Sequence, residues 1–91
     1  MAITVRIPTP LRRLTDGADS VGTDSANVEN AIENLEAQYP GIRERVIDDS
    51  GELHRFVNIY VNGEDIRFVD GLKTSIRDGD EVSIVPAVAG G

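Results

Sequence analysis

Hydrophobic and polar residues alternate along three stretches of the chain, the pattern typical of half-buried β-strands. The first is AITVRI at residues 2–7, the second is RFVNIYV at 55–61, and the third is EVSIV at 81–85. A weaker signal near residues 20–23, with Val21 facing inward, predicts another strand. Asn62-Gly63 predicts a tight turn, so we expect IRF at 66–68 to be a short returning strand.

Between residues 24 and 41 the hydrophobic period changes to that of a helix. Residues at spacings of three and four share one helical face: Val28, Ala31, Ile32, Leu35 and Tyr39. Asp24 or Ser25 is the expected N-cap, and Pro40-Gly41 should end the helix. Three glutamates lie off the apolar face and are interpreted as solvated: Glu29, Glu33 and Glu36. A second short helix or turn is expected at the start of residues 42–54.

The order strand, strand, helix, strand, short strand, strand suits a small mixed sheet with the helix packed across one face. A last strand beside the first would be parallel to it, because the connection between them crosses the whole fold. Together with the analogy described below, this order predicts an α+β fold of the β-grasp (ubiquitin-like) type, with four to five strands and one main helix. We expect residues 1–86 to form this domain and residues 87–91 to form a flexible Gly-Gly tail.

Composition narrows the possible functions. A chain of 91 residues has room for one core, and its net charge of −7 with scattered basic residues argues against nucleic-acid binding. The sequence has no apolar run near the ~18 residues of a membrane span, and MAITVRIP does not resemble a signal peptide, so a cytoplasmic protein is expected. With no cysteine and a single histidine, His54, neither a thiolate metal site nor a catalytic triad is expected.

The last residues carry the strongest functional signal. After Pro86 the chain reads AVAGG, which has no charge and little bulk. Gly90 and Gly91 have no Cβ, so Ala87, Val88, Ala89 and Gly90 could thread a narrow channel in a partner and present the Gly91 carboxylate there. A frayed end without function is the alternative interpretation.

A carboxylate is a poor electrophile, so the Gly91 carboxyl group would first need activation. ATP can convert it to an acyl-adenylate, and a sulfur donor can then displace AMP to leave a terminal thiocarboxylate. The absence of cysteine agrees with this chemistry, because an internal thiol could attack the activated terminus.

Four stretches resemble the ubiquitin-like sulfur carriers of the MoaD/ThiS superfamily. They are VRIPTPLR at 5–12, NLEAQYPGIRERV at 34–46, LHRFVNIYVNGEDIRF at 53–68 and DGDEVSIVPAVAGG at 78–91. The terminal Gly-Gly is the mark of the superfamily. HRFVNIYVN and PAVAGG resemble more narrowly the branch that delivers sulfur for cysteine biosynthesis.

The resemblance implies a carrier that is acted on by partner enzymes and is not itself an enzyme. An ATP-dependent E1-like adenylyltransferase/sulfurtransferase would load sulfur on Gly91. A cysteine synthase using pyridoxal phosphate would pair the thiocarboxylate with an activated serine, and a zinc metallopeptidase of the JAMM type would release cysteine. ATP, pyridoxal phosphate and zinc would thus belong to the partners, with no cofactor bound by this chain. Sulfur delivery for molybdopterin or thiamin, attachment to protein lysines, and a non-covalent binding module remain alternatives.

Three side chains are candidates for docking a partner. Tyr60 is expected to be exposed on the sheet face away from the helix. For Phe68 we favour packing in the core under residues 69–76, with exposure and docking as the alternative. Arg67 could pair with acidic partner residues, although a solubilising role is favoured, and His54 is expected to be a loop or edge residue.

Overall fold

The computed structural model describes residues 2–86. Five strands and two α-helices are joined by three 3-10 turns. In chain order the elements are β1 (Ala2–Arg6), η1 (Thr9–Leu14), β2 (Ser20–Asp24), α1 (Val28–Gln38), α2 (Arg43–Val46), β3 (Val57–Val61), β4 (Glu64–Asp65), η2 (Ile66–Phe68), η3 (Gly71–Lys73) and β5 (Glu81–Pro86).

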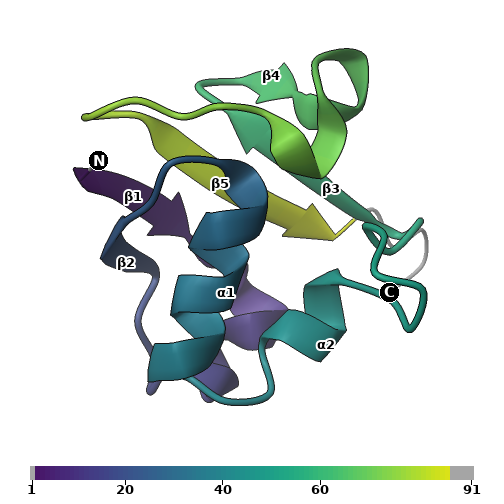
Figure 1. Ribbon diagram of the computed structural model, residues 1–91. Coiled ribbons are helices and arrows are strands. Elements are labelled where there is room, and N and C mark those ends of the chain that lie inside the picture. The colour runs from purple at the N-terminus through teal and green to yellow at the C-terminus, as the bar shows by residue number, and fades with distance from the viewer. Residues whose placement is uncertain (1, 87–91) are drawn as a thin grey trace.

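The strands form one mixed sheet in the order β2-β1-β5-β3-β4 (Figure 1). β5 runs parallel to β1, with Val5 opposite Val82, and antiparallel to β3, with Ile59 opposite Ile84. The parallel pairing of the first and last strands is confirmed. It places the final strand in the centre of the sheet.

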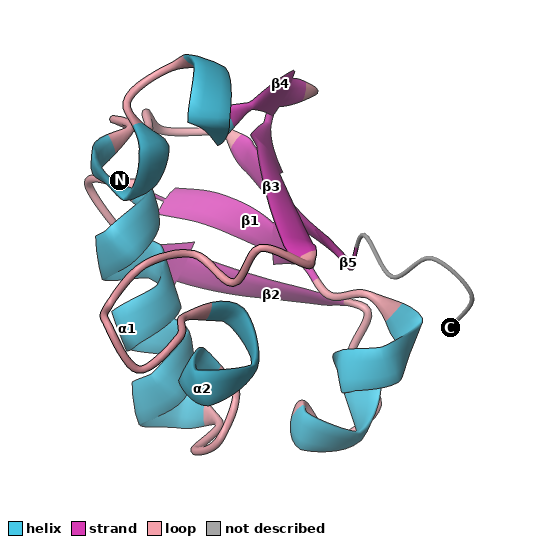
Figure 2. Ribbon diagram, turned by 90° about the vertical axis from the view of Figure 1, so that its right-hand side faces the viewer, coloured by secondary structure: helices cyan, strands magenta, loops and turns pink. Residues whose placement is uncertain are grey.

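Helix α1 packs across one face of the sheet (Figure 2). The predicted apolar residues of the helix supply this contact: Val28, Ala31, Ile32 and Leu35 are all buried. They meet the inward residues of the strands, such as Val5, which is 1% exposed. On β1 the residues in between are exposed, so alternation along the strand separates core from solvent as predicted.

The N-cap of α1 is Asn27, and the prediction of Asp24 or Ser25 was wrong. The Asn27 side chain accepts a hydrogen bond from the Asn30 amide at 2.7 Å, because the first helical residue is Val28. Ser25 is buried and accepts a hydrogen bond from the Asn34 side chain instead.

Residues 66–68 form the 3-10 turn η2, so the expected returning strand was wrong in extent. The turn at Asn62-Gly63 leads into β4, which is two residues long. The Asp65 carboxylate then accepts a hydrogen bond from the Arg67 amide and caps η2. This turn carries Ile66 into the core, where it is 0% exposed. Between β1 and β2 the chain forms η1, a 3-10 turn that begins after Pro8.

Candidate functional site

The predicted sulfur-bearing and threading residues, Gly91 with Ala87, Val88, Ala89 and Gly90, lie outside the residues that the structure describes. What the structure does define is Pro86, the residue from which they continue. Pro86 is opposite Val57 in the β3–β5 ladder, whereas the pairing of β5 with β1 extends to Ser83. We call the Pro86 end of β5 the tail root.

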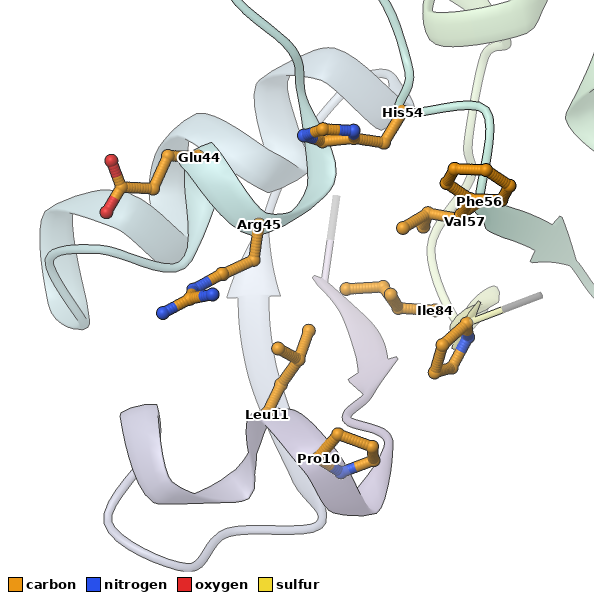
Figure 3. A pocket seen from close by; sticks show the side chains of 9 residues that line it. Pro10, Leu11, Glu44, Arg45, His54, Phe56, Val57 and Ile84 are labelled. Atoms are coloured by element: carbon orange, nitrogen blue, oxygen red, sulfur yellow. The ribbon is translucent and has the colours of Figure 1, made fainter. Parts of the chain in front are cut away.

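An open hollow of about 330 Å³ lies at the tail root on the helix side of the sheet (Figure 3). Its walls come from η1, α2, the loop before β3, and the adjoining ends of β3 and β5. The lining residues are Pro10, Leu11, Glu44, Arg45, His54, Phe56, Val57, Ile84 and Pro86. We call this the tail-root hollow.

The hollow has an apolar floor and a charged rim. Val57 and Ile84 are buried at its base, while the Phe56 ring is 56% exposed beside it. The Arg55 guanidinium lies 4.9 Å from the centre of the Phe56 ring, within the range of a cation–π contact. Arg45 is exposed at the rim. The combination of apolar floor and basic rim is the composition expected of a surface that binds a protein.

A second hollow, of about 300 Å³, borders the tail root beside the outward side chains of the sheet. It differs in chemistry, since its lining includes Arg6, Arg12, Asp19 and Ser83. The Arg12 Nε atom donates a hydrogen bond to the Ile7 carbonyl at 3.1 Å, so this guanidinium helps to hold η1 against β1.

The three predicted docking residues have different surroundings. Phe68 is 86% exposed, so the favoured prediction of core packing was wrong. The reason is that Ile66 fills the core position of η2. Tyr60 is half-buried rather than fully exposed. Tyr60 lies away from the tail root, because β4 pairs with the far end of β3, with Tyr60 opposite Asp65.

Arg67 has a local structural role. Its guanidinium donates hydrogen bonds to the carbonyls of His54 and Val57, at 3.1 and 2.9 Å, and to the side chain of Asn58. It therefore ties η2 to the start of β3. His54 lines the tail-root hollow, which agrees with its predicted place in a loop before the strand.

Sequence reasoning missed the tail-root hollow. Its walls combine residues from separate parts of the chain, among them Leu11, Arg45 and Phe56. The one available signal was HRF at 54–56, a bulky run directly before the strongest strand. The pairing of this strand with the last one, which the sequence did not predict, is what brings Phe56 next to Val57, the partner of Pro86.

Residues 2–86 have neither a metal-binding cluster nor a membrane-spanning helix. They contain no group of three or more histidine, aspartate or glutamate side chains placed to hold a metal ion. In the same part of the chain, no helix has the length and apolarity to cross a membrane.

The fold and the Pro86 end of β5 define a ubiquitin-like β-grasp carrier domain. The chain belongs to the ThiS family, whose profile matches residues 5–91. The sulfur carrier protein CysO of Mycobacterium tuberculosis is 57% identical over 100% of both chains. Its crystal structure has a TM-score of 0.90 to this fold and covers 94% of this chain and 99% of that one. The predicted fold class and sulfur-carrier family are thereby confirmed.

Two other relatives bear on partners and chemistry. CysO in the BexX/CysO complex from Amycolatopsis orientalis has a TM-score of 0.93 and 48% identity, covering 99% of this chain and 100% of that one. Small archaeal modifier protein 3 of Haloferax volcanii is 44% identical over 75% of this chain and 73% of its own length. The family therefore includes a carrier crystallised with a protein partner and a protein named as a modifier.

Proposed function

We propose that this chain carries sulfur as a thiocarboxylate on Gly91 for the synthesis of cysteine. The observation that carries the proposal is the family match, which runs through residue 91 and so includes the Gly90-Gly91 pair. Full-length similarity to a protein named as a sulfur carrier supports the same conclusion.

The chemistry proceeds in two steps at one carbon atom. The Gly91 carboxylate attacks the α-phosphorus of ATP, pyrophosphate leaves, and an acyl-adenylate forms. Sulfide then attacks the carbonyl carbon, a carbon–sulfur bond replaces the carbon–oxygen bond to AMP, and AMP leaves. The terminal carboxylate is fully ionised at neutral pH, so it is ready for the first step without a base from this chain.

The catalytic groups belong to partners in this proposal, and the chain itself is a co-substrate rather than an enzyme. An E1-like enzyme supplies adenylation and sulfur transfer. A pyridoxal-phosphate enzyme joins the sulfur to an activated serine, and a zinc metallopeptidase of the JAMM type cuts the amide that results. The similarity to a carrier crystallised in a complex supports the expectation of protein partners. The proposed cycle is expected in the cytoplasm, where ATP is supplied.

Intact-mass spectrometry tests this function directly. The full-length chain is incubated with the E1-like enzyme of the same organism, ATP, Mg²⁺ and sulfide. A mass gain equal to the difference between sulfur and oxygen is expected, and it should be lost in a chain lacking Gly90 and Gly91. An unchanged mass under conditions in which the enzyme consumes ATP with its other substrates would refute the proposal.

Protein modification is a second candidate function, favoured by the similarity to a small archaeal modifier protein. It uses the same activated Gly91 but transfers it to an amine instead of to sulfide. Conjugates of high mass that survive reducing gels would support it, because an isopeptide bond resists thiols. Sulfur transfer and modification start from one adenylate, so the two functions are compatible.

A further inference from the structure

The short distance from Pro86 to Gly91 restricts where a partner can bind, if Gly91 is the reacting residue as proposed above. Residues 87–91 can span at most about 18 Å, even when fully extended. An enzyme that acts on the Gly91 carboxyl group must therefore place its catalytic centre within that distance of Pro86. Its surface must then rest on the faces that surround the tail root.

The two hollows that border the tail root offer different chemistry. The outer one presents charged side chains from Arg6, Arg12 and Asp19. The tail-root hollow has Val57 and Ile84 at its floor and the Phe56 ring at its wall; of these, only Ile84 also borders the outer hollow. An apolar side chain of a partner therefore gains most from leaving water when it binds in the tail-root hollow.

One exposed aromatic side chain, Phe56, marks the tail-root hollow. Among residues 2–86 the large apolar side chains that remain exposed are Phe56, Phe68, Val69 and Val85. Phe56 precedes Val57, the partner of Pro86, and Val85 directly precedes Pro86. Phe56 contributes a wall of the tail-root hollow, whereas Val85 lines the outer hollow on the other face of the sheet.

Charges on the rim define the complementary surface. Arg45, His54 and Glu44 line the hollow, and Arg55 lies over the Phe56 ring beside it. This region therefore has two guanidinium groups, of Arg45 and Arg55, and one carboxylate, of Glu44, although the chain as a whole has a net charge of −7. The local excess of positive charge favours a carboxylate on whatever binds.

We propose that the tail-root hollow is the docking site for the E1-like adenylating enzyme. The enzyme inserts an apolar side chain between Phe56 and Leu11, and an adjacent aspartate or glutamate of the enzyme pairs with Arg45. Docking here fixes Pro86 against the enzyme and leaves residues 87–91 to reach the ATP site. This assignment differs from the docking surface predicted from sequence, which consisted of Tyr60, Arg67 and Phe68.

Calorimetric binding of the full-length chain to the adenylating enzyme, without ATP, tests the site. Phe56→Ala and Arg45→Glu should each weaken binding by about tenfold or more, as truncation of an interface anchor does. Phe68→Ala is the matched aromatic control and represents the rival surface. Arg77→Glu is the matched charge control, because Arg77 is exposed and lies before the opposite end of β5. Both controls should bind as the unmodified chain does.

Kinetics separate this inference from the proposed function. In ATP–pyrophosphate exchange, the two hollow variants should raise KM for the carrier and leave kcat within about twofold, since Gly91 is unchanged. Equal affinity of all four variants, weaker binding of Phe68→Ala alone, or no binding by the unmodified chain would overturn the docking site. Normal docking with no adenylation would instead refute the function of Gly91 and leave the docking site standing. Circular dichroism melting checks that each variant is folded.

Discussion

Pro86 of β5 lies opposite Val57 of β3 in the ladder that joins these two strands. The pair fixes the direction in which the chain leaves the sheet, because Val57 is buried and β5 is a central strand. A terminus that must enter an active site benefits from such a fixed starting point, since fewer conformations have to be lost on binding. In the function proposed above, the sheet is the rigid part of the carrier and the chemistry takes place beyond it.

Gly90→Val should leave the fold intact and impair adenylation by about a hundredfold. The proposed route to the ATP site passes residue 90, where glycine has no Cβ and valine adds a branched side chain. Gly22→Val is a matched control, since Gly22 is exposed in the edge strand β2 and has open space where a Cβ would lie. Release of AMP and melting temperature are measured for both. Normal AMP release by Gly90→Val would contradict a narrow channel.

Lys73 is the single lysine in the sequence. If the activated Gly91 of one copy were transferred to a side chain of another copy, Lys73 is the expected acceptor. Its ammonium group lies 2.7 Å from the Glu29 carboxylate, and this hydrogen bond raises the Lys73 pKa. A raised pKa leaves less of the neutral amine that could attack the adenylate.

Self-conjugation should therefore be slow at neutral pH and faster at alkaline pH. Glu29→Gln should increase the yield of conjugates, because it removes the charge that holds the proton on Lys73. Lys73→Arg should abolish the internal isopeptide product and leave only attachment to the α-amino group. Reducing gels and peptide mass spectrometry measure both. If Glu29→Gln left the yield of conjugates unchanged, the ion pair would not be what protects Lys73 from conjugation.

The sheet and the main helix were predictable because the longer strands and α1 carry their own periodic signals. The strict alternation in residues 2–7 and the three-and-four spacing from Val28 to Leu35 show which side chains of each element are buried. The buried faces in turn determine how the strands and the helix pack. The two errors were local. The capping position and the 66–68 turn each depend on a single hydrogen bond, accepted by the side chains of Asn27 and Asp65, for which several nearby polar side chains are equivalent candidates.

At the terminus, Gly91 as the sulfur-bearing residue stays a prediction from the sequence, because residues 87–91 lie outside the described part of the chain. The tail-root hollow could not be predicted, since it depends on how η1 and α2 pack over the end of β5, and both elements are too short to have a periodic signal. Arg67 illustrates the same limit: its bonds to His54 and Val57 follow from the position of η2 beside β3.

Arg67→Ala should reduce stability by about 1 kcal/mol, because the carbonyls of His54 and Val57 lose a charged hydrogen-bond donor. The side chain is solvent-exposed, so water replaces part of what is lost. Arg67→Lys should recover less than half of the effect, since a single ammonium group cannot reach three acceptors with the geometry of a guanidinium. Urea unfolding measures both. Unchanged stability with weakened partner binding would restore Arg67 to the docking role predicted from sequence.

Glu36 gives the fold a defined dependence on pH. Its carboxylate accepts hydrogen bonds from the Arg43 amide at 2.9 Å and from the Gly41 amide at 3.0 and 3.1 Å. These bonds, that to Arg43 foremost, lower the Glu36 pKa below its ordinary value. A pKa that is lower in the folded state than in the unfolded chain stabilises the fold above the unfolded value, and this stabilisation is lost as pH falls through the folded value.

Glu36→Gln should therefore be less stable than the unmodified chain at neutral pH. The difference in free energy of unfolding between the two, called the gap below, should narrow as pH falls below the ordinary glutamate range near 4. The glutamine cannot carry the charge that the two amides stabilise, so the variant lacks this component at every pH. Glu33→Gln is the control, because Glu33 is an exposed glutamate of the same helix. Urea unfolding across this pH range measures the gap. A gap that stays constant as the solution is acidified would show that Glu36 acts through the shape of its side chain and not through its charge.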